Sequence, residues 1–151
     1  MPEPMRRTTA RVLPVNRDGE VLLLFGCDPR RPETPYWFTI GGATEAGESL
    51  AEAGVREMRE ETGIVVSPGD LVGPYHRGLH EFEWNGWQIA NDSHFFAVRV
   101  DDVSVSFDGL EPLEVDTVFD SGWWSPRQMP DELSNPDLPE VARLAVAAVG
   151  L

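Results

Sequence analysis

Three glutamates with helical spacing are the residues of this sequence best suited to chemistry. Glu57, Glu60 and Glu61 occupy positions i, i+3 and i+4, so on a helix their carboxylates project from one side. Like charges at that spacing destabilise a helix by about 0.2–0.5 kcal/mol per pair, and a divalent cation would relieve the repulsion. Mg²⁺ suits such hard oxygen ligands and usually bridges to the phosphates of a substrate. Taken alone, however, an acidic helix face is more often a solvated surface.

A helix over residues 49–62 is predicted to carry these carboxylates. Ser49 and Glu52 have the spacing of a capping box, and Gly63 stands where a helix commonly ends in the left-handed conformation. Gly54 weakens a helix by up to about 1 kcal/mol relative to alanine, so we expect a close packing contact to require it. The apolar stripe of this helix is modest: Leu50, Ala53, Gly54 and Met58.

The spacing around the helix is much more specific than the glutamates alone. From Gly42 to Ile64 the chain reads Gly42, five residues, Glu48, seven residues, Arg56-Glu57-Met58, one residue, Glu60-Glu61, one residue, Gly63-Ile64. This segment resembles the Nudix box of the MutT-like Nudix hydrolases at every specified position, and Met58 is the softest match. With ordinary residue usage, a chance match in this length is on the order of one in ten million. One departure from the family is Ile40, where proline often precedes the two glycines.

The resemblance implies a role for each polar group of the motif. The expected metal ligands, for Mg²⁺ or Mn²⁺, are three carboxylates and a backbone carbonyl: Glu57, Glu60, Glu61 and Gly42. Arg56 and Glu48 would orient the glutamates by ion pairing, although a plain structural salt bridge explains them equally well. The implied reaction is attack of water on a phosphorus atom of a nucleoside diphosphate linked to another group. Clustered metals would neutralise the pyrophosphate and lower the pKa of the attacking water.

The sequence leaves the general base open. Glu57 is one candidate, and a carboxylate outside the motif is another. Glu81, Glu83 and Asp92 lie in segments that could supply such a carboxylate. Each of these three, considered individually, is more often a solvated strand or loop residue.

The charge balance restricts the partners. Twelve arginines and no lysines stand against twenty-six acids, which gives a formal net charge of −14. An acidic surface repels phosphate backbones, so broad binding to nucleic acid or to an anionic membrane is not expected. A phosphate ligand would need metal cations or a few placed arginines. Arg11, Arg77 and Arg99 are candidates, and the sequence does not choose among them.

The segments around the motif are predicted to form strands and one further helix. Residues 8–16 and 20–25 are typical of a β-hairpin, and residues 36–40 of a short aromatic strand that leads into the motif. The other expected strands are 71–76, 79–90 with a turn at Asn85-Gly86, 94–100 and 115–124. Residues 101–120 hold seven acids and no basic residue, which favours a solvated loop with an edge strand. Asp137 is expected to begin the last helix as its N-cap.

The length of 151 residues fits one domain, which we expect to have its core at residues 8–149. The resemblance implies an α+β fold, an α/β/α sandwich with a mixed sheet between helices and the motif as a loop–helix–loop. Cys27 is the single cysteine, which excludes an intramolecular disulfide. Residues 1–7 lack the apolar region of a signal peptide, and no window approaches a membrane span, so a cytoplasmic protein is expected.

Three functional hypotheses follow from these observations. The leading one is a Mg²⁺-dependent Nudix pyrophosphohydrolase that acts on a small nucleotide. The second is a non-catalytic Nudix-type domain that senses a nucleotide metabolite, although binding alone would not require the complete set of glutamates. The third, an acidic interaction module, is disfavoured by the spacing of the motif. The sequence does not choose the substrate, and Trp84 and Trp87 beside the expected turn are compatible with either a base-stacking surface or a homodimer.

Overall fold

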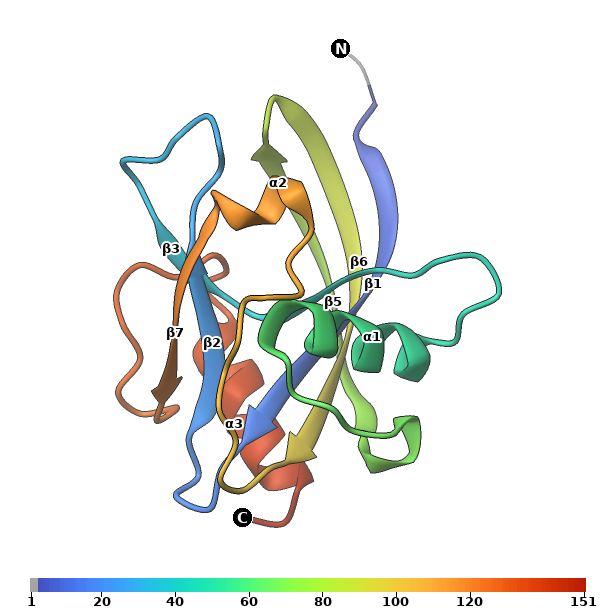
Figure 1. Ribbon diagram of the computed structural model, residues 1–151, viewed down its shortest axis with the longest axis vertical. Helices are drawn as coiled ribbons and strands as arrows, with labels where there is room; N and C mark the ends of the chain where they lie inside the picture. The colour runs from blue at the N-terminus through green and yellow to red at the C-terminus, as the bar shows by residue number, and fades with distance from the viewer. Residues whose placement is uncertain (1–2) are drawn as a thin grey trace.

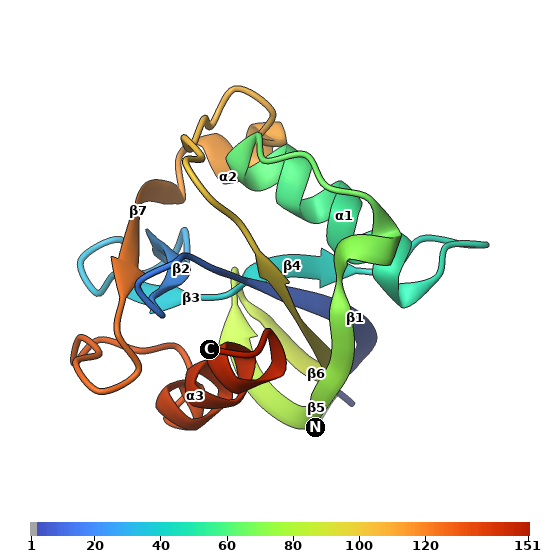
Figure 2. The ribbon, with the colours of Figure 1, turned by 90° about the horizontal axis from the view of Figure 1, so that it is seen from below.

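Two helices cover opposite faces of a curled mixed sheet in this protein (Figures 1 and 2). The structure is a computed structural model that describes residues 3–151, apart from the side chain of Leu113. The prediction that residues 1–7 are not a signal peptide includes residues 1–2, which lie outside the described residues. The α/β/α layering and the mixed sheet agree with the predicted α+β class. In chain order the elements are β1 (Met5–Val15), β2 (Val21–Gly26), β3 (Tyr36–Phe38), β4 (Ile40–Ala43), α1 (Leu50–Thr62), the 3-10 turn η1 (Pro68–Asp70), β5 (Val72–Trp84), β6 (Trp87–Arg99), the short α2 (Pro112–Val115), β7 (Val118–Trp124) and α3 (Leu138–Ala148).

Strand β1 lies in the middle of the sheet, whose order is β3-β2-β1-β6-β5 with β4 and β7 as additional partners of β1 and β2. It runs parallel to β6 along its whole length, and its other edge pairs antiparallel with β4. The predicted hairpin of residues 8–16 and 20–25 is therefore only partly formed, since Val15 and Val21 are the register pair that joins β1 to β2. The rest of that edge of β1 is occupied by β4. Gly41 makes this possible, because a Cβ at its position would overlap the carbonyl oxygen of Ala10.

Strands β5 and β6 form one long hairpin, and the predicted turn at Asn85-Gly86 is confirmed. Both turn residues have positive φ, 50° and 80°, as a two-residue hairpin turn requires. Three segments predicted as separate strands, 71–76, 79–90 and 94–100, are in fact parts of these two strands. The pairing register shifts between Val72 and His76, whereas the predicted break at residues 77–78 is absent because β5 continues through it. Each strand has 13 residues and thus reaches from the core to the outer end of the sheet.

Helix α1 has the predicted caps. The Ser49 side chain accepts a hydrogen bond from the Glu52 N–H, the Glu52 carboxylate accepts one from the Ser49 N–H, and Gly63 ends the helix with φ of 75°. Gly54 faces β1, where an added Cβ would stand 2.9 Å from Cγ2 of Val12. The expectation of a close contact at Gly54 is therefore confirmed. This contact brings α1 close to the sheet, so the position of its polar face relative to β1 is well defined.

The acidic segment 101–120 agrees in part with the prediction of a solvated loop with an edge strand. All of its acids except Glu114 are exposed, and β7, which begins at Val118, pairs only with β2. The apolar residues of the segment differ from the prediction. They pack against the core cluster that contains Met58 and Ile64, and they are Val103, Val105, Phe107 and Leu110. The Ser106 N–H donates to the Thr62 carbonyl over 2.8 Å, which ties the segment to the end of α1. In this segment the described residues form the short helix α2 and no strand before β7. The apolar residues between the acids are the reason, because their burial holds the segment against α1.

Helix α3 covers the face of the sheet opposite α1 (Figure 2). Its buried side is Leu138, Val141, Ala142 and Ala145. Asp137 is the N-cap residue, but its side chain makes no capping hydrogen bond. None of the described helices is long and apolar enough to cross a membrane.

Candidate active site

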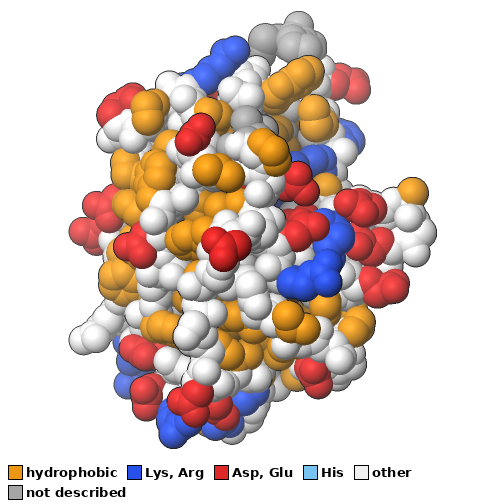
Figure 3. All heavy atoms as spheres, viewed as in Figure 1, with side chains coloured by type: hydrophobic (Ala, Val, Ile, Leu, Met, Phe, Trp, Pro, Cys, Tyr) orange, Lys and Arg blue, Asp and Glu red, His pale blue; other side chains and the backbone are white. Residues whose placement is uncertain are grey.

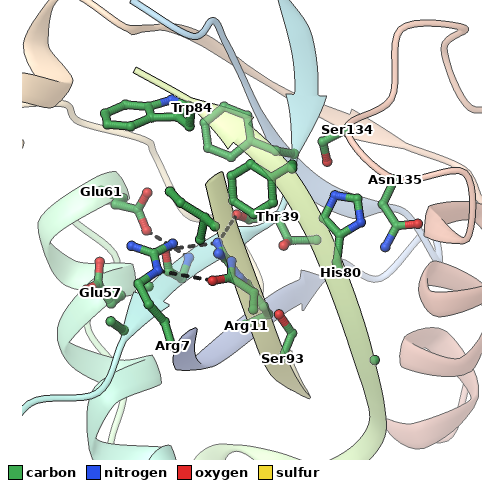
Figure 4. Close-up of a pocket in the computed structure, with 18 of the residues that line it drawn as sticks. Arg7, Arg11, Thr39, Glu57, Glu61, His80, Trp84, Ser93, Ser134 and Asn135 are labelled. Atoms are coloured by element: carbon green, nitrogen blue, oxygen red, sulfur yellow. Dashed lines mark hydrogen bonds between the residues drawn. The ribbon is translucent and has the colours of Figure 1, made fainter. Parts of the chain in front are cut away.

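A cavity of about 790 Å³ lies between the polar side of α1, strands β1, β5 and β6, and the segment that leads into α3 (Figure 4). Its size is within the usual range of small-molecule sites, about 300–1,000 Å³. We call the side with Glu57, Glu60, Glu61 and Glu114 the acidic end and the side with His80, Ser134 and Asn135 the far end. In Figure 4 the labelled members of the two ends stand on opposite sides of the cavity.

The acidic end concentrates carboxylates in a poorly solvated place. Glu61 is only 2% exposed, and its carboxylate accepts the Gly41 N–H over 2.8 Å. Burial, together with the nearby charges of Glu57 and Glu114, raises the pKa of Glu61 well above its ordinary value. Burial also raises the pKa of Glu57, although the charge of Arg56 opposes this effect. Such a set of carboxylates is destabilised by its own charge and favours a cation.

Arg56 is the internal counter-ion of this group. It forms a two-pronged contact with Glu48, with N–O distances of 2.7 and 2.9 Å. Its Nη1 donates to Glu57 over 2.9 Å and to Glu60 over 3.4 Å. Its Nη2 also donates to the Ala43 carbonyl over 3.1 Å, which ties α1 to the end of β4. The structure thus brings Arg56 and Glu48 together with two of the predicted metal ligands, as ion pairing required.

The residues present fit a divalent cation, although they are not arranged around one. Gly42 lies directly against Glu57, since a Cβ there would stand 2.6 Å from the Glu57 Oε1 atom. Among the described residues, no group of three or more His, Cys, Asp or Glu converges on one point. Nη1 of Arg56 contacts both Glu57 and Glu60 and takes the place between them. The carboxylates of Glu57, Glu60 and Glu61 and the Gly42 carbonyl are nevertheless hard oxygen donors of the kind that Mg²⁺ prefers.

Sequence reasoning missed Glu111 and Glu114, which also line the cavity. Glu114 is partly buried, and its pKa is raised by burial and by the charges of Glu60 and Glu111. The prediction of a solvated loop placed both residues at the surface, which is correct for the exposed Glu111 but not for the partly buried Glu114. The alternation of Val103, Val105 and Phe107 was the available signal, because apolar residues at every second position indicate a segment that packs against a core.

The predicted candidates for the general base are distributed unequally. Glu57 and Glu83 line the cavity, whereas Glu81 and Asp92 do not. Successive side chains of a strand point to opposite faces, so Asp92 of β6 lies opposite to its neighbours Asn91 and Ser93, which do line it. Asp92 instead binds Arg77 with two contacts of 2.8 Å.

Basic and aromatic groups line the middle of the cavity. Of the three arginines considered for phosphate binding, the structure brings Arg11 to the cavity and leaves Arg77 and Arg99 outside it. Arg7, which the sequence did not suggest, lies beside Arg11 (Figure 4). The aromatic side chains that line the cavity include Tyr36, Phe82 and Trp84. Trp87, the other tryptophan beside the hairpin turn, is 59% exposed and lies outside the cavity.

At the far end, His80 and Asn135 lie next to each other, with Ser134 above them in the view of Figure 4. Burial and the charge of Arg11 lower the pKa of His80. Its neutral imidazole therefore offers one donor and one acceptor near neutral pH. Together with the Asn135 amide, this end presents both kinds of hydrogen-bonding group, as recognition of a nucleobase edge requires.

The outer surface agrees with the restriction set by charge. On the face shown in Figure 3, arginines stand apart among acidic side chains and form no continuous basic surface. A nucleic-acid backbone needs many adjacent cationic contacts. The face shown in Figure 3 therefore offers no continuous row of cationic side chains to a polynucleotide backbone.

Comparisons with known proteins agree on one family. The family model described as "NUDIX domain" matches residues 5–144. The uncharacterized Nudix hydrolase YvcI of Bacillus subtilis (strain 168) is 38% identical over 100 residues, which are 60% of this chain and 56% of that protein. The CTP pyrophosphohydrolase of Escherichia coli (strain K12) is 37% identical over 67 residues, 42% of this chain and 46% of that protein. The chain thus spans about half the length of these two relatives.

A solved structure shows the same fold. The dihydroneopterin triphosphate pyrophosphohydrolase of E. coli superposes with a TM-score of 0.69, and the match covers 96% of this chain and 99% of that chain. The sequence identity is 17%, so this likeness concerns the arrangement of the elements and not the substrate.

Proposed function

This chain belongs to the Nudix family, and from that premise we propose that it is a Mg²⁺- or Mn²⁺-dependent pyrophosphohydrolase. It would cleave a nucleoside diphosphate linked to another group by attack of water on phosphorus. The observation that carries the proposal is the acidic end of the cavity, where Glu61 is buried beside the partly buried Glu57 and Glu60. Arg56 is paired with Glu57 and Glu60 and leaves Glu61 without an ion pair among the described residues. Buried carboxylates with raised pKa values are stabilised by a cation, and a metal can supply that charge.

We assign the roles of the chain's own groups as follows. The carboxylates of Glu57, Glu60 and Glu61, with the carbonyl of Gly42, would hold the metal. A bound metal supplies a Lewis acid that neutralises the pyrophosphate and lowers the pKa of a coordinated water. Arg56 and Glu48 are positioning residues, because their two-pronged contact fixes the guanidinium from which Glu57 and Glu60 take their orientation.

The proton of the attacking water needs an acceptor. Glu57 and Glu83 remain candidates, and Glu114 joins them because it lines the cavity next to the charge of Glu60. Glu81 and Asp92 are no longer suitable, since their side chains lie outside the cavity.

A small nucleotide is the substrate class that fits best. The aromatic faces of Tyr36, Phe82 and Trp84 can stack on a base, and the cavity volume of about 790 Å³ accommodates a nucleotide with a linked group. The net charge of −14 argues against a polynucleotide. The expectations of a cytoplasmic protein and of a homodimer stay predictions.

The test is hydrolysis of a panel of nucleoside triphosphates, ADP-ribose, nucleotide sugars and dinucleoside polyphosphates, with Mg²⁺ and with EDTA. We expect product release with Mg²⁺ only, and loss of it in the Glu60→Gln variant. The matched control is Glu140→Gln on α3, where the exposed carboxylate pairs with Arg143 far from the motif in sequence. The wild-type protein should also unfold at a higher temperature with Mg²⁺, because a ligand of the folded state stabilises it.

Two outcomes contradict the proposal in different ways. Tight nucleotide binding without turnover of any compound would favour the non-catalytic sensor. Near-normal turnover by Glu60→Gln would contradict the assignment of Glu60 as a metal ligand, but it would not contradict the proposed hydrolysis.

A further inference from the structure

Two arginines of β1 face the cavity from the same side of the strand. Arg7 and Arg11 are four residues apart, and side chains at every second position of a strand share a face. Thr9 lies between them, and its hydroxyl is 2.8 Å from that of Ser93 on the parallel strand β6. Figure 4 shows the two guanidinium groups side by side in the cavity, between Glu57 and Glu61 on one side and His80 and Asn135 on the other.

Neither arginine has its charge paired within the protein. Arg7 donates from Nε to the Asn91 side-chain oxygen over 3.0 Å, and Arg11 donates from Nη1 to the carbonyls of Thr39 and Gly41 over 3.3 and 3.1 Å. All of these acceptors are neutral. Within the part of the chain that the structure describes, Arg7 has no partner for its two terminal nitrogens and Arg11 has none for Nε or Nη2. These donors therefore remain available to a ligand.

Partial burial distinguishes these two arginines from the others that lack an ion pair. Among the described residues the others are all exposed: Arg6, Arg30, Arg59, Arg99 and Arg127. Arg56, Arg77 and Arg143 each bind a carboxylate at 2.6–2.8 Å, and the chain has twenty-six acids to choose from. Burial lowers the pKa of both Arg7 and Arg11, which means that their surroundings disfavour the charge. A partly buried cation without a counter-ion destabilises the folded protein. An anionic ligand would remove that penalty.

The position of the pair selects the kind of anion. Arg7 lies near the charge of Glu57, and Arg11 lies near both Glu61 and His80, so the pair stands between the acidic end and the far end. A nucleotide whose base occupies the far end and whose cleaved bond lies at the acidic end must pass its phosphate chain along this pair. Guanidinium groups match phosphate oxygens through two parallel hydrogen bonds.

We propose that Arg7 and Arg11 form an anion-binding pair that holds a phosphate group between the nucleoside and the bond at the acidic end. The pair would thereby favour nucleoside di- and triphosphates over monophosphates and free nucleosides. This inference rests on the proposed function for the orientation of the substrate, but the pair binds phosphate through its own donors. Its test therefore does not need hydrolysis.

The test measures binding by calorimetry in EDTA, with adenosine, AMP, ADP, ATP and inorganic pyrophosphate as the probes. For the wild-type protein we expect affinity to increase with the number of phosphates and to fall with added salt. Arg7→Met and Arg11→Met should each weaken ATP and pyrophosphate binding by about tenfold, the effect of losing one charge-assisted contact. Affinity for adenosine should change by less than about twofold.

Matched variants separate the proposed role from a general loss of charge or of structure. Arg99→Met removes a charge from an exposed position on β6, outside the cavity, and should bind ATP as the wild type does. Arg11 also donates to the Gly41 carbonyl, so Arg11→Met removes a contact to β4 as well as a charge. The side chain of Arg7 hydrogen-bonds only to Asn91 among the described residues, so Arg7→Met removes a single hydrogen bond and is the cleaner test of the proposal. Arg7→Lys, which restores a charge, should recover part of the affinity.

The outcomes distinguish this proposal from the proposed function. If the wild type binds neither ATP nor pyrophosphate at millimolar concentrations, or if both methionine variants bind them normally, the anion-binding pair is wrong. If binding depends on the arginines but no nucleotide is hydrolysed with Mg²⁺, the anion-binding role of the pair is supported and the proposed enzymatic function is contradicted. With hydrolysis present, the same variants should raise KM by about tenfold and leave kcat nearly unchanged, whereas Glu60→Gln should lower kcat and keep the metal-free binding.

Discussion

Two acid-rich segments meet at the acidic end of the cavity, residues 42–64 and residues 101–120. The first has six acids and the second seven. In the first, helical spacing gathers the carboxylates on one side of α1, so neighbours in space are near neighbours in sequence. In the second, Glu114 reaches the same place because Val103, Val105 and Phe107 pack the segment beside α1. The number of acids in a segment does not tell whether they form a site or a solvated surface. The spacing of the acids and the apolar residues between them decide where the carboxylates lie.

The largest expected difference between the two segments concerns the carboxylate on α1. Glu57→Gln removes a charge that the proposed metal site needs, so we expect kcat to fall by about 10²–10⁴-fold, as for loss of a catalytic acid or base. Asp108→Asn, an equal change in the other segment at an exposed position outside the cavity, should leave kcat unchanged. Steady-state hydrolysis measures both. A similar decrease in the two variants would mean that total acidity, and not position, determines the rate.

An intermediate effect is expected for Glu114, where the two segments come together. Glu114→Gln should reduce activity or Mg²⁺ affinity by about 10–100-fold, as is typical of groups next to metal ligands. The control is Asp116→Asn, two residues away and exposed. Activity as a function of Mg²⁺ concentration separates a lost ligand, which shifts the midpoint, from a lost base, which lowers the plateau. If both variants behave as the wild type, Glu114 is only a neighbour of the site.

The smallest expected effect concerns the packing that brings the second segment to the first. Phe107→Ala removes a partly buried ring from the core beside α1, so the free energy of unfolding should fall by about 1–2 kcal/mol, less than for a fully buried ring. Urea denaturation gives the value, and Val65→Ala, at a side chain 73% exposed, should change it by less than about 0.5 kcal/mol. No loss of stability in Phe107→Ala would mean that the segment is not held by its apolar residues.

Local patterns allowed much of the fold to be predicted, because they depend on residues close in sequence. The caps at Ser49 and Gly63 and the turn at Asn85-Gly86 depend on a few neighbouring residues, and all three are confirmed. The edge of β1 was predicted less well, since its pairing with β4 rather than β2 depends on the absence of a side chain at Gly41. When two strands compete for one edge of a third strand, the sequence of neither strand alone indicates which of them pairs there.

The candidate site divides in the same way. The carboxylates of Glu57, Glu60 and Glu61 are near neighbours on one helix and could be grouped from spacing alone. The cavity position of Arg7 depends instead on the parallel pairing of β1 with β6, which sets it opposite Asn91. The residues next to Arg7 in the sequence do not indicate that its side chain lies in the cavity.

The alternation along β1 has a consequence for how the length of this chain can change during evolution. Arg7 and Arg11 face the cavity, whereas Ala10 and Val12 support α1. A single residue inserted in the middle of the strand would exchange these faces for every position beyond it, and would lose the ligand contacts and the support of α1 together. Insertions and deletions among descendants of this sequence should therefore fall in the loop of residues 27–35 and spare β1.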